Sequence, residues 1–271
     1  MAREFDFYIV PTPIGNISDI SIRAIEILKS VDLIACEDTR TTQKLLNHYD
    51  IKTKSISYHK YNERERISFF IETLKSGKKV ALVSDAGTPM ICDPGSIVVE
   101  ELLKNGFTVT SLPGACAITT FLSQIPRESE QFKFIGFVPR IESQIKEVVL
   151  KNVDTNLVFY DSPERIIKTL NVIKAARGDI KIALGRELSK LFEEVIADNI
   201  SAVLEHYKDG IKGEIVCMVY ADKNSELVDI DNKILNLKQK GFKDKEISVI
   251  LSELFNLNKN DVYKRVLEMK S

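Results

Sequence analysis

The 271-residue sequence lacks several features that would assign it at once to a class of protein. No apolar run approaches the roughly 20 residues that are needed to cross a bilayer. The first residues, Met1 to Asp6, run into strand-like sequence without the apolar region of a secretory signal peptide. We therefore expect a cytoplasmic protein that makes no membrane contact.

Cysteine and histidine are also scarce. The chain has four cysteines and three histidines, with no C-x-x-C pair and no histidine cluster beside a cysteine. This argues against a structural zinc site and provides no disulfide framework. We expect no metal site, and we expect buried thiols at the four cysteine positions, which are Cys36, Cys92, Cys116 and Cys217.

Two familiar nucleotide-binding motifs are missing. The sequence has no G-x-G-x-x-G that opens a helix and no G-x-x-x-x-G-K-[ST]. Both motifs place backbone amides around phosphates, so their absence disfavours a dinucleotide enzyme and a P-loop ATPase. No internal repeat and no low-complexity segment appears either.

The net charge of −1 conceals an uneven distribution. Residues 40–66 contain seven Lys/Arg against three acidic residues, and residues 233–271 contain nine against five. Local positive surface on a neutral protein is compatible with a polyanionic partner, although ordinary solvated faces would give the same counts.

Apolar runs rich in β-forming residues alternate with helix-like segments in residues 1–112. This alternation predicts an α/β fold with a mostly parallel sheet covered on both faces. The predicted strands lie near residues 7–10, 33–36, 80–83 and 109–112, and the predicted helices near 22–28, 41–48, 67–75 and 98–104.

The pattern changes after Pro126. Strand-like runs at 132–138, 155–160, 181–185 and 215–220 are separated by about two helices, which predicts a second, mixed α+β domain. From about residue 224 the sequence predicts a small helical appendage of helix-turn-helix character. The expected units are therefore an N-terminal α/β domain, an inter-domain helix and link, the second domain and the helical unit, at 1–112, 113–125, 126–223 and 224–271.

Three loops combine proline, glycine and small residues just after predicted strands: Pro11 to Gly15, Ser84 to Pro89, and Pro113 to Ala117. In open α/β sheets, ligands bind beyond the carboxyl ends of the strands. Glycine lets backbone approach a ligand closely, and proline fixes the loop. Each loop alone could be a turn, but their coincidence at one edge predicts a pocket for a small ligand that the residues do not identify.

These loops belong to an ordered set of short motifs. The set resembles the tetrapyrrole methylase superfamily, and more closely its branch that methylates the 2′-hydroxyl of a cytidine in bacterial 16S ribosomal RNA. The resemblance spans nearly the whole chain, including the helical tail, and rests on residues 8–16, 37–40, 84–89, 93–95, 113–115, 136–140, 159–165 and 185–190.

The resemblance implies two α/β domains, S-adenosylmethionine in the cleft between them, and a homodimer. Pro11 and Pro13 stand where tetrapyrrole enzymes have G-x-G-P-G, a departure typical of the ribosomal RNA branch. For Cys116, simple close packing remains an alternative to cofactor contact. The positions that match cofactor contacts are Pro13, Gly15, Ser84, Asp85, Ala86, Gly114, Ala115, Cys116, Ala117, Tyr160, Asp161 and Leu188.

A ribose 2′-hydroxyl is a poor nucleophile at neutral pH, so a nearby side chain could accept its proton. Candidates for this role are Asp38, His59 and Glu63, with Glu37 and Asp85 also near the proposed edge. The sequence does not choose among them. The basic stretch, with tyrosines between its charges, suits phosphates and unpaired bases. We expect the substrate side to include Arg40, His59, Asn62 and Arg64, together with Asp38.

Two rival functions remain open. One is a methyltransferase that acts on a tetrapyrrole carbon, and the other is an RNA-binding assembly factor that has lost catalysis. The intact set of cofactor loops disfavours the second, and the basic stretches and helical tail disfavour the first. Whether the RNA is naked or within the small ribosomal subunit, and whether the tail grips RNA or packs against protein, stays undecided here.

Overall fold

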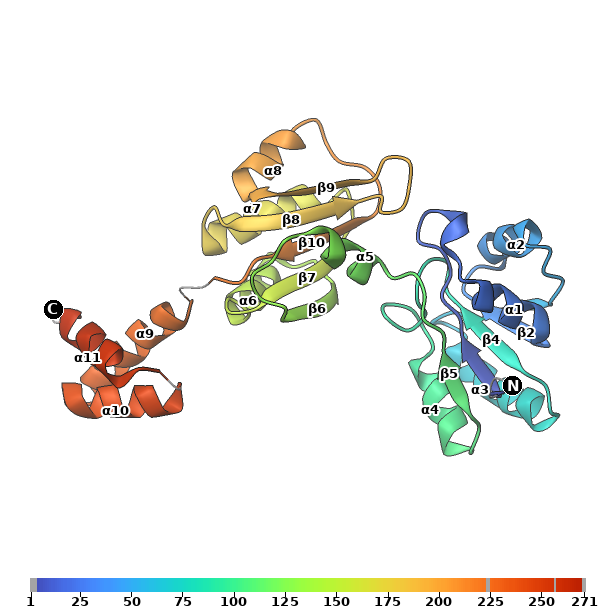
Figure 1. The fold of residues 1–271 in the computed structure, drawn as a ribbon, viewed down its shortest axis with the longest axis horizontal. Helices are drawn as coiled ribbons and strands as arrows, with labels where there is room; N and C mark the ends of the chain where they lie inside the picture. Colours follow the sequence, from blue (N-terminus) through green and yellow to red (C-terminus); the bar gives the residue numbers. More distant parts are fainter. Residues whose placement is uncertain (1–3, 223–224, 256, 270–271) are drawn as a thin grey trace.

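The computed structural model describes residues 4–222, 225–255 and 257–269, and it contains two five-stranded sheets followed by a group of helices (Figure 1). The predicted fold class, two α/β units with a helical appendage, is confirmed. Among the described residues, no helix is both long and apolar enough to cross a membrane.

The first sheet is entirely parallel and has the strand order β3-β2-β4-β1-β5. Its central strands are nearly pure runs of apolar residues because helices cover both faces. The strands are β1 (Phe7–Ile9), β2 (Leu33–Cys36), β3 (Ser55–Ser57), β4 (Val80–Val83) and β5 (Val109–Ser111). A 3-10 turn, η1 (Ile17–Asp19), and the helices α1 (Ile22–Ser30), α2 (Thr39–His48), α3 (Glu63–Lys75) and α4 (Ser96–Lys104) connect them.

Side chains alternate between the two faces of this sheet, as the pleat requires. Tyr8, Ile34 and Ala81 pack in one buried cluster with residues of α1 and α2. Phe7 and Leu33 pack in a second cluster with residues of α3 and α4. The two cores hold the strands firmly, so that the loops at both ends of the strands start from fixed positions.

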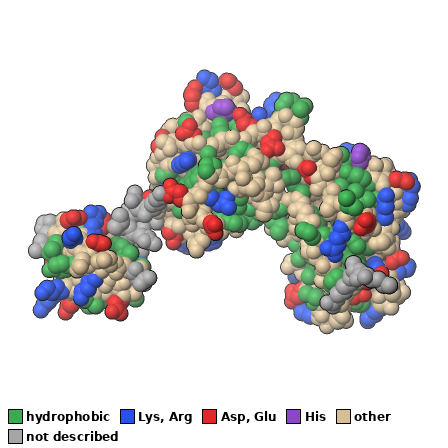
Figure 2. Space-filling model, in the orientation of Figure 1, with side chains coloured by type: hydrophobic (Ala, Val, Ile, Leu, Met, Phe, Trp, Pro, Cys, Tyr) green, Lys and Arg blue, Asp and Glu red, His purple; other side chains and the backbone are tan. Residues whose placement is uncertain are grey.

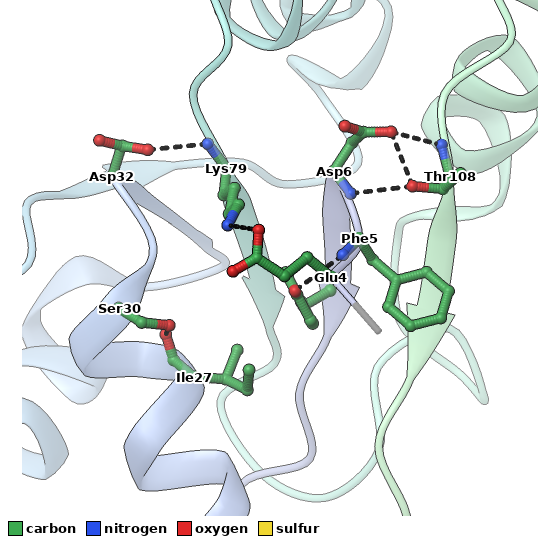
Figure 3. Close-up of polar contacts among 9 residues, drawn as sticks. Glu4, Phe5, Asp6, Ile27, Ser30, Asp32, Lys79 and Thr108 are labelled. Atoms are coloured by element: carbon green, nitrogen blue, oxygen red, sulfur yellow. Dashed lines mark hydrogen bonds and ion pairs between the residues drawn. The ribbon is translucent and has the colours of Figure 1, made fainter. Parts of the chain in front are cut away.

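The amino edge of the first sheet is held by polar contacts among its own residues (Figure 3). The Asp6 carboxylate accepts hydrogen bonds from the backbone nitrogen and the hydroxyl of Thr108, both at 2.7 Å. The Lys79 ammonium pairs with Glu4 at 2.8 Å, and the Lys79 backbone nitrogen donates to Asp32 at 2.8 Å. Donors and acceptors at this edge therefore find partners within the sheet.

The second sheet is mixed and has the order β6-β7-β10-β8-β9, with only the β6–β7 pair parallel. Helix α5 (Ala117–Gln124) packs on one face, and α6 (Glu142–Lys151), α7 (Ile166–Arg177) and α8 (Ile200–His206) pack on the other. The strands are β6 (Phe132–Phe137), β7 (Asn156–Asp161), β8 (Lys181–Arg186), β9 (Glu194–Asn199) and β10 (Ile215–Val219).

The last three helices, α9 (Ser225–Gln239), α10 (Asp244–Leu254) and α11 (Lys259–Glu268), share a small core of their own. Ile234, Ile247 and Val266 are among its fully buried side chains. Figure 1 shows this unit standing apart from both sheets. The expected boundary at residues 223 and 224 lies outside the described residues.

The sequence pattern missed two strands. β3 has the sequence Ser-Ile-Ser and is only half-buried at the end of its sheet. β9, at the end of the other sheet, has only three apolar residues, flanked by Glu194 and Asp198. Both strands have one open side, and neither carries the apolar run of four or more residues that a sequence pattern reveals.

Candidate functional site

A cavity of about 390 Å³ lies between the two sheet domains, at the carboxyl edge of the first sheet. This volume falls in the range of small-molecule sites. The first domain and α5 contribute Ile14, Ala86, Gly87, Thr88, Ile91, Cys92, Asp93, Cys116 and Ala117; the second domain contributes Phe137, Tyr160, Asp161, Ser162, Pro163, Leu188, Gly213, Glu214, Ile215 and Val216.

The first two loops are tied together before any ligand arrives. Thr12 and Gly87 form an isolated antiparallel bridge, with both backbone N–H···O distances at 2.9 Å. The Ser84 hydroxyl donates to the Gly87 carbonyl at 3.1 Å, and the Thr12 hydroxyl donates to the Ser84 carbonyl at the same distance. Gly87 has φ +82°, a conformation that glycine adopts without strain. This wall of the cavity is therefore a preorganised backbone surface.

Six of the residues predicted to contact the cofactor line the cavity. Ala86, Cys116 and Ala117 come from the first domain and the start of α5, and Tyr160, Asp161 and Leu188 come from the second domain. Residues that were predicted from the small-residue loops and from the second domain thus line the same cavity.

The other six surround the cavity without lining it. Ser84 and Asp85 are held in the β4 loop, and the Ala115 carbonyl accepts a hydrogen bond from the Thr88 hydroxyl at 2.8 Å. The remaining three, Pro13, Gly15 and Gly114, lie in the two neighbouring loops.

Gly15 and Gly114 permit close contacts between loops. A Cβ at Gly15 would lie 2.6 Å from the Leu188 carbonyl oxygen, across the domain boundary, and a Cβ at Gly114 would lie 2.5 Å from the Pro11 Cβ. Their place in the site is therefore that of close packing, which holds the loops together.

Asp161 lines the cavity, yet its side chain is fully buried and its oxygens are engaged. The Arg165 guanidinium donates two hydrogen bonds to Oδ1, one of them at 2.8 Å, and the Thr169 hydroxyl donates to Oδ2 at 2.6 Å. The Ser162 backbone nitrogen also donates to Oδ1 at 2.9 Å. The Asp161 side chain thus fixes the loop that follows β7 at the wall of the cavity.

Sequence reasoning missed several lining residues. Gly87, Thr88 and Asp93 lie inside motifs that were already noted, so those motifs contained the signal. Gly213 and Glu214 gave no such signal because they precede a strand. β10 runs antiparallel to β7, with Ile215 opposite Asp161, so the start of β10 lies beside the end of β7.

Three carboxylates influence one another beside the cavity. Burial raises the pKa of Asp93, a hydrogen bond from Ser84 opposes the shift, and the charge of Asp85 adds to it. Burial also raises the pKa of Glu37, and the charges of Asp93 and Asp85 add to this, while His59 opposes it. A carboxyl group whose pKa is raised holds a proton more readily than an ordinary one.

Two of the predicted proton acceptors are committed to other partners. Asp38 caps the start of α2 and pairs with Arg40 at 2.9 Å, and these contacts with Arg40 lower the pKa of Asp38 to about 2. Glu63 is buried; its Oε1 accepts a hydrogen bond from the Tyr58 hydroxyl at 2.6 Å and one from the Gly95 backbone nitrogen at 2.9 Å. The geometry gives both carboxylates a structural part.

The predicted substrate residues lie on the loop after β3 and the starts of α2 and α3. Asn62 braces that loop, since its Oδ1 accepts from the His59 backbone nitrogen at 2.9 Å and its amide donates to the Ser57 carbonyl at 3.2 Å. Arg40 and Arg64 are exposed. Within the described part of the chain, no hydrogen-bond partner reaches the buried Nδ1 atom of His59.

A metal-based site finds no support in residues 4–222, 225–255 and 257–269, where no three His, Cys, Asp or Glu side chains are grouped to hold an ion. The cavity instead has apolar walls and a few polar groups, which include Asp93 and the Tyr160 ring. Figure 2 shows lysine and arginine side chains on all three lobes of this face, mixed with acidic ones.

Comparisons with known proteins agree with this geometry. The model of a family described as Tetrapyrrole (Corrin/Porphyrin) Methylases matches residues 6–204. The ribosomal RNA small subunit methyltransferase I of Vibrio cholerae is 39% identical, over 96% of this chain and 94% of its own length. The protein of the same name from Bacillus subtilis is 44% identical, over 82% of this chain and 77% of its own length.

Solved structures show the same fold at low identity. Diphthine synthase matches with a TM-score of 0.64 and 18% identity, over 79% of this chain and 89% of that one. A Thermus thermophilus uroporphyrin-III C-methyltransferase complexed with S-adenosyl homocysteine matches with a TM-score of 0.55 and 17% identity, over 79% and 96%. The chain belongs to the tetrapyrrole methylase family, in the branch of the ribosomal RNA small subunit methyltransferases.

Proposed function

We propose that this chain transfers the methyl group of S-adenosylmethionine to the 2′-hydroxyl of a cytidine in 16S ribosomal RNA. The observation that carries the proposal is the inter-domain cavity at the carboxyl edge of the first sheet, in a chain that aligns with ribosomal RNA methyltransferases over most of its length. Neither rival function is favoured by a specific feature of the structure.

The residues of the cavity fit S-adenosylmethionine. Ile14, Leu188 and Val216 offer apolar surface, and the bridged backbone at Gly87 approaches the space without a side chain. The carboxylates Asp93 and Glu214 line the same space and suit a cationic sulfonium. The bound cofactor supplies an electrophilic methyl carbon.

The protein's contribution is orientation and proton transfer. Methyl transfer needs the hydroxyl oxygen in line with the methyl carbon, about 3–3.5 Å away, and rigid loops provide such positioning. Glu37 and Asp93 are the carboxylates at this edge whose pKa is raised, so they are the groups we assign to accept or relay the hydroxyl proton. Arg40 and Arg64 are exposed and able to contact phosphates.

The proposal extends to the setting of the reaction. We propose a cytoplasmic homodimer that acts on the small ribosomal subunit, with the α9–α11 unit as a second RNA contact. Size-exclusion chromatography with light scattering tests the dimer. A version ending at Asp222, before α9, tests the helical unit, since it should lose RNA affinity while it keeps cofactor affinity.

The decisive experiment is transfer of labelled methyl from S-adenosylmethionine to small ribosomal subunits that lack their native modifications. Naked 16S RNA and a tetrapyrrole precursor serve as parallel substrates. We expect label on the RNA that maps to a 2′-O-methylated cytidine. Label on the tetrapyrrole alone, or cofactor binding without transfer to any substrate, would contradict the proposal.

A further inference from the structure

We propose that Tyr61 is a stacking platform for an unpaired base of the RNA substrate, next to the nucleotide that is methylated. This inference rests on the proposed function, because it names a residue that positions that RNA. It follows from a difference in exposure among three tyrosines that the sequence alone does not distinguish, all within the basic stretch of residues 40–66.

Two of the three tyrosines are unavailable to a ligand. The Tyr58 side chain is fully buried, and its hydroxyl donates to Glu63 at 2.6 Å. The Tyr49 ring is partly buried, and its hydroxyl donates to the Ile17 carbonyl at 2.6 Å. Tyr61, by contrast, leaves 93% of its surface exposed. A ring that buries so little contributes little to folding, since apolar stabilisation scales with the area removed from water.

The ring of Tyr61 stands on a braced turn. The Asn62 backbone nitrogen donates to the His59 carbonyl at 3.0 Å, and the Asn62 side chain closes the same turn from the other side. The Tyr61 and His59 rings meet edge to face with centroids 6.0 Å apart and planes at 66°. Because the backbone that carries the ring is already braced, little backbone freedom is lost when a base stacks on Tyr61.

Strand direction and one long-range hydrogen bond place this turn at the edge that holds the cavity. The turn follows the carboxyl end of β3 at Ser57, and β3 runs parallel to β2. Directly after the turn, the Glu63 carboxylate accepts a hydrogen bond from the backbone nitrogen of Gly95, which is two residues from Asp93. Asp93 itself lines the cavity. Tyr61 therefore stands at the carboxyl edge of the first sheet, the edge at which the cavity lies.

The neighbours of Tyr61 suit a nucleic acid. Lys60 and Arg64 are exposed on either side of it, where they can meet phosphates. Single-stranded RNA is bound by this combination of cationic groups and aromatic rings, because every base has a π-face to stack.

The test compares Tyr61→Ala with Tyr61→Phe in the full-length protein. Methyl transfer is measured on small ribosomal subunits that lack native modifications, with S-adenosylmethionine affinity and Tm measured in parallel. Stacking by one base predicts that Tyr61→Ala lowers kcat/KM for the RNA by roughly fivefold to 150-fold. Tyr61→Phe should stay near wild type, and cofactor affinity and Tm should not change.

Leu103→Ala is the matched control, because Leu103 is also a large exposed apolar side chain, 55% exposed, in the last turn of α4, toward the amino edge of the sheet. It should transfer methyl at the wild-type rate. Lys60→Ala should instead reduce the salt dependence of RNA binding, because the lysine no longer releases counterions from a phosphate. Tyr61→Ala should leave this salt dependence unchanged, since stacking releases no counterions.

Two results would overturn the role of Tyr61. One is kcat/KM for Tyr61→Ala within twofold of wild type, and the other is an equal loss in Tyr61→Phe, which would point to the hydroxyl. Either result can be read only when the wild-type protein methylates RNA. If the wild-type protein methylates no RNA, the proposed function is contradicted, and this outcome differs from a loss of stacking at Tyr61.

Discussion

The two edges of the first sheet are built by the same five strands, yet they differ in how their polar groups are used. At the amino edge, Asp6, Thr108 and Lys79 bond to one another or to nearby acids (Figure 3). At the carboxyl edge, beside the cavity, burial raises the pKa of Glu37, and the charges of Asp93 and Asp85 raise it further.

The amino edge therefore serves stability and the carboxyl edge serves function within one small domain. Polar groups that hydrogen-bond to one another stabilise the fold and are not available to bind a ligand. Groups that share a partly buried edge with like charges are held there at a cost in stability, and such sites are where pKa shifts and function tend to coincide. The comparison therefore predicts opposite consequences for substitutions at the two edges.

The largest expected effect is a loss of stability at Glu63. The sequence made Glu63 a candidate proton acceptor, whereas in the structure it accepts two buried hydrogen bonds. Glu63→Ala leaves the Tyr58 hydroxyl and the Gly95 amide without their acceptor, and each unsatisfied buried group costs about 1–3 kcal/mol. We expect the free energy of unfolding, measured with denaturant, to fall by about 2–6 kcal/mol.

Glu63→Gln retains an oxygen that can accept both hydrogen bonds, so it should recover most of this stability and nearly all activity. A stable Glu63→Gln protein that has lost methyl transfer would instead restore Glu63 to the catalytic group.

The second effect compares two glycines with the same φ of +82°, Gly87 at the cavity and Gly106 at the opposite edge. An alanine at either position pays a similar backbone penalty of roughly 1–2 kcal/mol. At Gly87 the new Cβ would also lie 3.2 Å from Ile14 Cγ2 in the cavity wall, whereas at Gly106 nothing lies within 4 Å.

Cofactor titration should therefore show at least about a tenfold weaker Kd for Gly87→Ala, which corresponds to roughly 1.4 kcal/mol, and an unchanged Kd for Gly106→Ala. Equal Kd values for both variants would remove Gly87 from the binding wall.

A third, smaller effect is expected at the amino edge. Asp6→Ala removes two hydrogen bonds to Thr108, worth about 0.5–1.5 kcal/mol each. Chemical denaturation should report this loss, while the methyl-transfer kinetics of the remaining folded protein stay at the wild-type level. A change in KM for RNA or cofactor would show that the amino edge is not purely structural.

The smallest expected effect is a pH-dependent gain in thermal stability when Asp93 is replaced by asparagine. The folded-state pKa of Asp93 is raised above its ordinary value of 3.8, so the protonated form stabilises the fold below that value. This stability is lost as pH rises from 3.8 through the folded pKa. Asp93→Asn should therefore raise Tm at pH 7 and lose that advantage toward pH 4, while methyl transfer falls. A Tm below wild type at pH 7 would contradict the shift.

The sequence predicted every interior strand of the two sheets, but of the four edge strands it predicted β5 and β6 and missed β3 and β9. Leu33–Cys36 and Val80–Val83 are buried at every residue, so their apolar runs are unmistakable. β3 and β9 are partly exposed edge strands with one and three apolar residues, too few for an unmistakable apolar run. An apolar run is therefore a more reliable guide to a strand that is buried on both faces than to one at the edge of a sheet.

The site shows the same division. Loops after parallel strands were predictable because the carboxyl ends of such strands meet at one edge, which placed Ala86 and Cys116 at the cavity. Gly213 was not predictable, because its position depends on the antiparallel course of β10. The structural part of Glu63 depends on Tyr58 and Gly95, and the contact with Gly95 is long-range in sequence.

The most direct test of the central claim is a crystal structure of the protein with S-adenosylhomocysteine. The account predicts ligand density in the cavity between the domains, in contact with Gly87, Cys116 and Leu188. Density at the amino edge near Thr108, or in the hollow of the second domain beside Arg177, would contradict it.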